Sequence, residues 1–223
     1  MFKSVLLYTN KLKSMKRFYA NVLRLDIKKS TDDYFIVNVG ETDITFKQSN
    51  EPSFYHFAIN IPGNQFVIMK DWIEGRINLI RINGKSEIYY KNLGADSMYF
   101  EDPAGNLVEL IGRRNRDFFG SLTKEAFYDV SEIGITTPQM FEVGEELQDM
   151  GLALKQRTEV DMNLMNYLGR DDTYIVLVPP EWEWEFSEKS AETHPLEITF
   201  NDGQHIAMDK KGKITITEVE TED

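Results

Sequence analysis

The spacing of apolar residues near the N-terminus predicts a strand, then a helix, then three more strands. Residues 4–9 alternate, with Val5 and Leu7 on one face, as in a half-buried strand. A helical spacing then joins Met15, Phe18 and Val22. Three short apolar runs follow at residues 25–28, 34–39 and 43–48, separated by polar turns. The pattern is that of a βαβββ module.

The same order of elements begins again twice. A second module starts with a strand at residues 55–61 and continues into a helix that carries Phe66, Met69 and Ile73. A third starts at residues 132–138, where the sequence EIGITTP matches HFAINIP at residues 56–62 without a gap. Such self-similarity indicates duplicated modules.

The pattern weakens toward the C-terminus. The strands expected in the third module lie at residues 152–155, 164–168 and 173–178. After Pro179 and Pro180, only two further strands are expected, at residues 196–200 and 213–218, with no helix between them. This region is predicted to be a truncated fourth module.

Residues 100–110 predict a strand, a tight turn and a second strand that contains a carboxylate. Pro103 fixes φ within the turn, and Gly105 or Asn106 can adopt a positive φ, so the chain reverses between two apolar runs. Successive side chains of a strand point to opposite faces. Glu109 therefore points to the face opposite to that of its two neighbours.

Composition narrows the classes of partner. The 223 residues are 41% hydrophobic, which is enough for one large or two small domains with a real core. A net charge of -12 argues against nucleic acid as a partner. No apolar run has the length of a membrane span or a signal peptide, so we expect no membrane association and a cytoplasmic location. Without cysteine, any metal must be bound by histidine, carboxylate or backbone oxygen.

Three segments, in this order, resemble the vicinal oxygen chelate superfamily, which includes glyoxalases, bleomycin-resistance proteins and extradiol dioxygenases. They are residues 18–23, 55–59 and 100–110. The resemblance implies an α+β fold in which repeated βαβββ modules form curled mixed sheets around a cleft. One departure is Arg24, where the superfamily usually has glycine between two leucines.

The resemblance also implies a domain organisation. Residues 1–113 resemble a complete, glyoxalase-like domain of two modules, and the polar residues 114–127 are expected to be a linker. Residues 128–223 would then hold the third module and the truncated, divergent fourth.

Enzymes of this superfamily bind a divalent metal in the cleft, with ligands from the first and last strands of paired modules. His56 and Glu109 occupy both of these positions in the second module, and strand alternation also directs His56 toward the cleft. The matching positions of the first module hold Ser4 and either Thr45 or Lys47, which are not usual metal ligands. Only half of the expected ligand set is present.

The incomplete ligand set leaves two interpretations open. A catalytic metal usually has about three protein ligands. Either His56 and Glu109 bind a metal that is completed by water, substrate or Glu132 of the third module, or they form a hydrogen-bonded pair in a metal-free cleft. Further candidates for ligand binding around the first cleft are Tyr8, Lys47 and Tyr99.

Four other residues are weaker candidates. Trp182 and Trp184, between acidic residues, form either an aromatic lip that binds a cation or, as we favour, a cover over the core. His194 and His205 lie near expected turns and are predicted to be solvated.

The favoured function is that of a glyoxalase- or bleomycin-resistance-like protein that binds a small molecule in its cleft without a complete metal site. One alternative is a lyase, isomerase or dioxygenase of the same superfamily that depends on a divalent metal. Another is a non-catalytic interaction protein, such as a homodimer, that uses the open edges of the incomplete modules.

Overall fold

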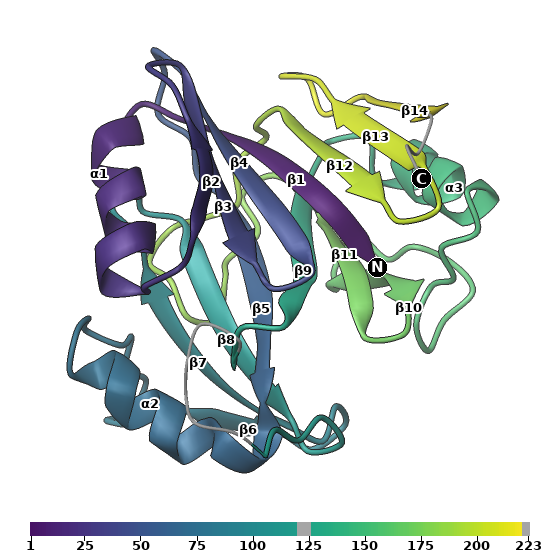
Figure 1. Cartoon of the computed structure of the whole chain (residues 1–223). Helices are drawn as coiled ribbons and strands as arrows, with labels where there is room; N and C mark the ends of the chain where they lie inside the picture. The colour runs from purple at the N-terminus through teal and green to yellow at the C-terminus, as the bar shows by residue number, and fades with distance from the viewer. Residues whose placement is uncertain (120–125, 220–223) are drawn as a thin grey trace.

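The computed structural model describes residues 1–119 and 126–219, which form two seven-stranded mixed sheets (Figure 1). The first sheet has the order β14-β13-β12-β1-β4-β3-β2 and the second the order β10-β11-β9-β5-β8-β7-β6. The α+β fold of curled mixed sheets that the sequence predicts is confirmed.

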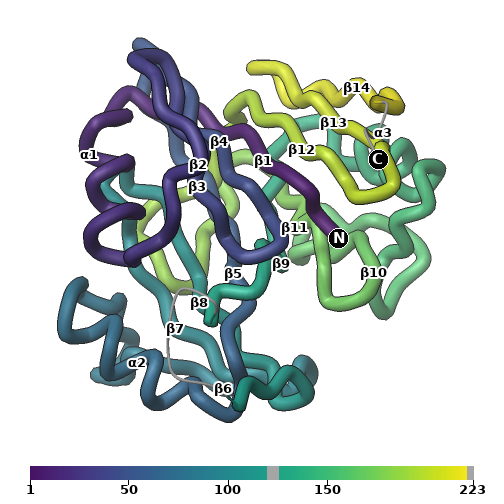
Figure 2. Tube along the Cα trace, viewed as in Figure 1, coloured from purple at the N-terminus to yellow at the C-terminus, as the bar shows by residue number. Residues whose placement is uncertain are grey.

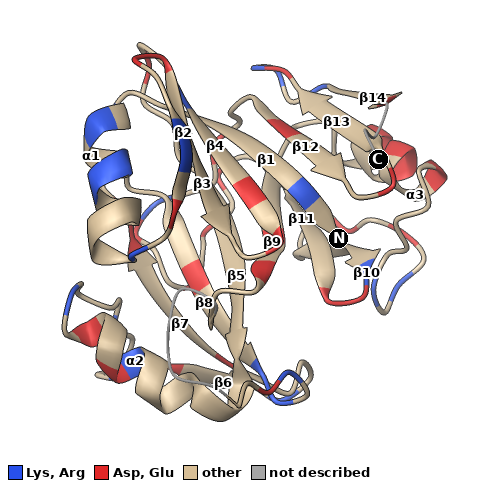
Figure 3. Ribbon diagram, viewed as in Figure 1, with Lys and Arg blue, Asp and Glu red and all other residues tan. Residues whose placement is uncertain are grey.

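The first sheet consists of β1 (Phe2–Thr9), β2 (Ile27–Ser30), β3 (Tyr34–Val39), β4 (Thr42–Gln48), β12 (Leu196–Phe200), β13 (Gln204–Met208) and β14 (Ile214–Glu218). The second consists of β5 (His56–Pro62), β6 (Ile88–Tyr90), β7 (Ala95–Glu101), β8 (Leu107–Arg113), β9 (Asp129–Thr136), β10 (Asn166–Arg170) and β11 (Thr173–Val178). The α-helices are α1 (Leu12–Arg17), which continues as a π-helical turn, α2 (Phe66–Glu74) and α3 (Met140–Asp149). Within these bounds, α1 carries only basic charged residues and α3 only acidic ones (Figure 3).

The first module pairs with the C-terminal strands, and the second module pairs with the third. Antiparallel pairing of β1 with β12 joins the first module to the C-terminal strands, and antiparallel pairing of β5 with β9 joins the second module to the third. Figure 2 shows the result, with the C-terminal strands lying beside β1 near the start of the chain. Each sheet is therefore completed within one chain.

The sheets cut across the predicted domains. The strands of residues 1–113 are divided between both sheets, and each sheet takes further strands from residues 128–223. The boundaries of the predicted domains stay a prediction. Part of the expected linker, residues 120–125, lies outside the described residues.

Two details of the C-terminal half differ from expectation. Residues 152–155 were expected to form a strand, but among them only Leu154 forms a bridge, to Leu168. The fourth module gains a strand, β13, between the two that the sequence predicts. Its alternation is interrupted by polar residues such as Gln204 and His205, which explains why the apolar pattern missed it.

Strand alternation in the second module is as predicted. Phe57, Ile59 and Leu110 point into the main core, where their side chains are at most 1% exposed. His56 and Glu109 point to the opposite face of the same sheet. The main core therefore fixes the direction of both candidate ligands.

The turn between β7 and β8 is organised by Asp102. Its buried carboxylate accepts hydrogen bonds from the backbone N–H groups of Ala104 and Asn106 and from the hydroxyl of Tyr19, at 2.9, 3.0 and 3.0 Å. Gly105 adopts φ 88°, as the turn requires. The contact with Tyr19 ties the first module to the hairpin that carries Glu109.

Arg24 adopts φ 58°, at the corner where the superfamily pattern has glycine. A non-glycine residue in this region is strained by about 1 kcal/mol or more. We expect Arg24→Gly to raise the free energy of unfolding by up to about 1 kcal/mol, because part of the gain is lost to the greater entropy of the unfolded chain. Urea unfolding measures the change.

Arg17→Gly is the matched control, since Arg17 is helical with φ -60°. This variant should lose about 1 kcal/mol. Equal loss of stability in both variants would contradict the strain at Arg24.

Candidate functional site

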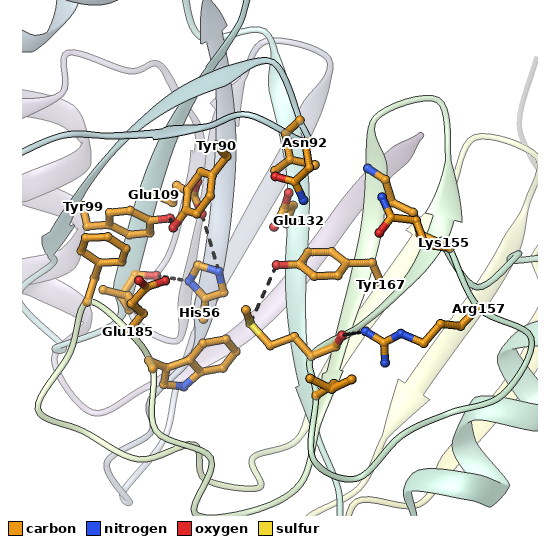
Figure 4. Close-up of a pocket in the computed structure, with 17 residues that line it drawn as sticks. His56, Tyr90, Asn92, Tyr99, Glu109, Glu132, Lys155, Arg157, Tyr167 and Glu185 are labelled. Atoms are coloured by element: carbon orange, nitrogen blue, oxygen red, sulfur yellow. Dashed lines mark hydrogen bonds and ion pairs between the residues drawn. The ribbon is translucent and has the colours of Figure 1, made fainter.

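A cavity of about 290 Å³ lies on the face of the second sheet that points away from the main core (Figure 4). The second module, the third module and the loop between β11 and β12 all contribute to its walls. Its aromatic side chains are Tyr90, Tyr99, Tyr167, Trp184 and Phe186, and its charged or titratable side chains are His56, Glu109, Glu132, Lys155, Arg157 and Glu185. The cavity combines apolar walls with a few convergent polar groups, as ligand sites do.

Three of these residues form a buried cluster. His56, Glu109 and Glu132 each offer one ligand atom, and these atoms all lie within 4.8 Å of one another. Nε2 of His56 lies 3.9 Å from Oε2 of Glu109, which is too long for a hydrogen bond. His56 and Glu109 therefore do not form a hydrogen-bonded pair. Instead, three atoms that could each bind a metal converge in the cluster.

Strand register explains why the two carboxylates meet. Glu109 of β8 and Glu132 of β9 both lie directly opposite Ala58 of the central strand β5. Two strand spacings separate their backbones by about 10 Å, and the small side chain of Ala58 leaves room for both carboxylates above it. His56 precedes Ala58 by two residues and so points to the same face.

Hydrogen bonding fixes the tautomer of His56. Its Nδ1 lies 3.2 Å from the carbonyl oxygen of Leu107, so Nδ1 donates and Nε2 keeps its lone pair. The ring of Trp184 packs against it, with centroids 4.6 Å apart. Burial lowers the pKa of His56 to about 4, which keeps the imidazole neutral. A neutral imidazole whose other nitrogen donates to a carbonyl is the form that binds metals.

Both carboxyl groups of the cluster are poorly compensated. Burial, and to a smaller extent the negative charge of Glu132, raises the pKa of Glu109 to about 8. Burial also raises the pKa of Glu132, although Arg113 opposes this shift. As long as no further cation binds beside it, Glu109 is mainly protonated in the folded protein at neutral pH.

Arg113 is the fixed cation behind Glu132. Its side chain is 2% exposed and donates to Oε1 of Glu132 at 3.4 Å and to Oδ1 of Asn60 at 3.2 Å. A buried guanidinium with these partners holds Glu132 in place from one side. The sequence analysis placed Arg113 only at the end of a domain, because no local pattern marks an arginine that pairs with the next module.

The structure brings together only some of the predicted site residues. His56, Glu109 and Tyr99 line the cavity, and Glu132 joins them. The hydroxyl of Tyr99 lies 2.9 Å from that of Tyr90.

Tyr8 and Lys47 belong to the first sheet and do not line this cavity. Lys47 Nζ lies 5.9 Å from the centroid of the Tyr8 ring. Ser4 and Thr45 are also in the first sheet. The partner of the second module is the third module, so the missing ligands of the first module do not weaken this site.

The remaining candidates are the two tryptophans and the two other histidines. Trp184 lines the cavity, while Trp182 packs against the neighbouring aromatic cluster as a cover. The sequence predicts that His194 and His205 are solvated. In the structure their side chains are mostly buried, at only 17% and 18% exposed. His194 contacts Glu192 and His205 contacts Thr199.

The sequence analysis missed several residues of the cavity. Tyr90, Lys155, Arg157 and Tyr167 come from a short edge strand, a loop and β10, where no motif announces them. Tyr90 belongs to the same module as His56, and the tertiary pairing of the second and third modules brings Lys155, Arg157 and Tyr167 near His56.

Comparisons with known proteins agree with this fold. A putative dioxygenase from Bacillus subtilis subsp. subtilis str. 168 has a similar structure, with a TM-score of 0.58 and 19% identity, over 79% of this chain and 62% of that chain. Lactoylglutathione lyase from Agrobacterium tumefaciens matches with a TM-score of 0.44 and 20% identity, over 53% of this chain and 97% of that chain. No curated protein matches the sequence.

A sequence model of the family described as toxoflavin-degrading enzyme matches residues 130–181, which is less than half of the chain. The chain has the vicinal oxygen chelate fold, as its sequence motifs predict. Among the residues that the structure describes, no helix is long and apolar enough to cross a membrane.

The pKa of Glu109 gives a prediction about stability. An acid whose pKa rises from 4.5 to about 8 on folding keeps a proton that the unfolded chain releases. The contribution of Glu109 to the free energy of unfolding of the metal-free protein should therefore fall as the pH rises from about 4.5 to about 8, whereas the lowered pKa of His56 contributes a rise between about pH 4 and pH 6.5. Glu109→Gln removes this fall, so in a chelator the variant should be more stable than the wild type at pH 8 and equal to it near pH 5.

Urea unfolding at several pH values measures this difference. Glu142→Gln, at an exposed position of α3, is the control and should change the profile little. A difference in stability between wild type and Glu109→Gln that stays constant between pH 5 and pH 8 would contradict the pKa assigned to Glu109.

Proposed function

We propose that the cavity binds a small, partly aromatic molecule and that His56, Glu109 and Glu132 hold a divalent metal ion beside it. The observation that carries the proposal is the convergence of three buried donor atoms within 4.8 Å, on three adjacent strands. Of the groups that the sequence offered to complete the ligand set, the convergence favours Glu132. The resulting set has the number of ligands that a catalytic metal site usually has.

The chemistry of the donor set fits a divalent metal. One imidazole nitrogen and two carboxylate oxygens suit Mn²⁺, Fe²⁺ or Zn²⁺, and thiolate is not needed. A divalent cation would also compensate the negative charges of the two buried carboxylates, which Arg113 and, at longer range, Lys155 compensate in part. Arg113 contacts Oε1 of Glu132, and the second oxygen of the carboxylate is available for a metal.

When bound, such a metal would polarise an oxygen atom of the ligand. The protein itself supplies the walls that orient the ligand and exclude water. Tyr99 stacks on Phe186, with ring centroids 4.1 Å apart and planes at 5°, and Trp184 packs against His56. At about 290 Å³, the cavity is at the lower limit of ligand pockets, which suits a molecule of one or two rings.

A second candidate function is the metal-dependent breakdown of such a molecule. The matched stretch, residues 130–181, includes Glu132, Lys155 and Tyr167 of the cavity. Because the description of that family names a degrading enzyme, the match favours breakdown of the ligand over simple sequestration. A loss of ultraviolet absorbance of an aromatic compound that needs both metal and Glu109 would identify an enzyme.

Metal binding is the first test. We expect one equivalent of Mn²⁺ to bind per chain, and at about 100 times its Kd the ion should add about 2.7 kcal/mol to the free energy of unfolding. His56→Ala, Glu109→Gln and Glu132→Gln should each abolish the rise in melting temperature. Equilibrium dialysis and thermal unfolding measure both quantities.

His205→Ala is the control, because His205 lies in the first sheet, away from the cluster. Its response to Mn²⁺ should equal that of the wild type. If the wild type binds no metal, or if the three variants bind as it does, the proposed metal site is wrong.

Ala58 provides a test of the geometry. A larger side chain between Glu109 and Glu132 should occupy the space in which the carboxylates converge. Ala58→Val is therefore expected to reduce Mn²⁺ affinity at least tenfold while the protein stays folded. Titration calorimetry measures the affinity and circular dichroism the fold.

Ala126→Val is a matched control, since Ala126 is equally buried but lies in the main core. Overpacking should cost both variants about 1–3 kcal/mol of stability. Only Ala58→Val should lose the metal, and equal affinities would contradict the register argument.

A further inference from the structure

The cavity holds charges of opposite sign in separate places. The acidic cluster lies over the adjacent strands β8, β5 and β9, whereas Lys155 and Arg157 come from the loop between α3 and β10. In Figure 4, Lys155 and Arg157 lie on one side of Tyr167, and His56 and Glu109 lie on the other. A ligand that fills the cavity would therefore meet both groups.

Neither cation forms an ion pair with a carboxylate of the described residues. Nζ of Lys155 lies 4.4 Å from the centroid of the Tyr174 ring. Arg157 donates one hydrogen bond, to the backbone carbonyl of Met165 at 3.4 Å. Lys155 affects the cluster only at longer range, where it helps to lower the pKa of Glu132. Both side chains keep donors for a ligand.

The backbone holds the two cations at the cavity. The N–H of Lys155 donates to the carbonyl of Tyr167 at 2.8 Å, which attaches the loop to β10. Gln156, between the two cations, adopts φ 64°. Strained residues of this kind are concentrated at ligand sites.

We propose that Lys155 and Arg157 bind the carboxylate of a small aromatic acid, whose other end faces His56, Glu109 and Glu132. The inference rests on the proposed ligand site and adds the charge of its ligand. Charge-assisted hydrogen bonds from an ammonium and a guanidinium to one carboxylate are stronger than those to a neutral group. The two cations thus select for an acid over its neutral analogue.

Matched pairs of an aromatic acid and its amide test the proposal, because the two members differ in charge and hardly in shape. The panel contains protocatechuate and its amide, and naphthoate and its amide. Titration calorimetry with the full chain, with and without Mn²⁺, should show about tenfold tighter binding of the acid of a pair that binds. The preference should persist without Mn²⁺, since it arises away from the metal ligands.

The double variant Lys155→Met with Arg157→Met should bind acid and amide equally, with the affinity of the wild type for the amide. The control is Lys13→Met with Lys211→Met, which changes the net charge equally at two exposed positions. It should keep the tenfold preference, because its cations do not line the cavity.

The outcomes separate this inference from the proposed function. If the wild type binds acid and amide equally, or the double variant keeps the preference, the anion site is wrong and the ligand site stands. If Mn²⁺ does not bind but the preference for the acid is present, the metal site is wrong and the anion site stands. If no compound of the panel binds, both the ligand site and the anion site are overturned.

Discussion

The antiparallel pairing of β5 with β9 is the contact on which the candidate site depends. It places Glu132 of the third module beside Ala58, while the parallel pairing of β5 with β8 places Glu109 on the other side. Without the first pairing, His56 and Glu109 would be two isolated groups of one module. With it, three donor groups lie on one face of three adjacent strands, and the main core behind β5 fixes their directions.

The same pairing imposes an energetic cost. It buries two carboxyl groups close together, and burial disfavours their charged forms. Arg113 offsets part of this cost through Glu132, and the remainder appears as the raised pKa of Glu109. A stable fold would not retain such a cluster for packing alone, since apolar residues of similar volume are often at least as stabilising. The cost of burying the cluster is one reason to propose a cation site there.

The features that the sequence predicts correctly are those that depend on residues close together in the chain. Alternation in β5 and β8 predicts correctly that His56 and Glu109 share a face, and the modules are recognisable from their periodicity. It does not predict which modules pair, because the choice between β1 and β9 as the neighbour of β5 is made by contacts between distant residues. For that reason Glu132 was only one of several groups that could complete the site, and Tyr8 and Lys47 were expected near a cleft that the second sheet forms without them.

The first sheet contains a counterpart of the candidate site that lacks most of its ligands. Its central strand β1 repeats the register of β5, because Leu6 lies opposite both Thr45 of β4 and Glu197 of β12, as Ala58 lies opposite Glu109 and Glu132. Ser4 precedes Leu6 by two residues, as His56 precedes Ala58. The equivalent row thus keeps one carboxylate, replaces the imidazole and the second carboxylate with hydroxyls, and fills the space between them with leucine. The two sheets share this framework, and three of the four side chains at equivalent positions differ, which leaves the candidate ligand set in the second sheet.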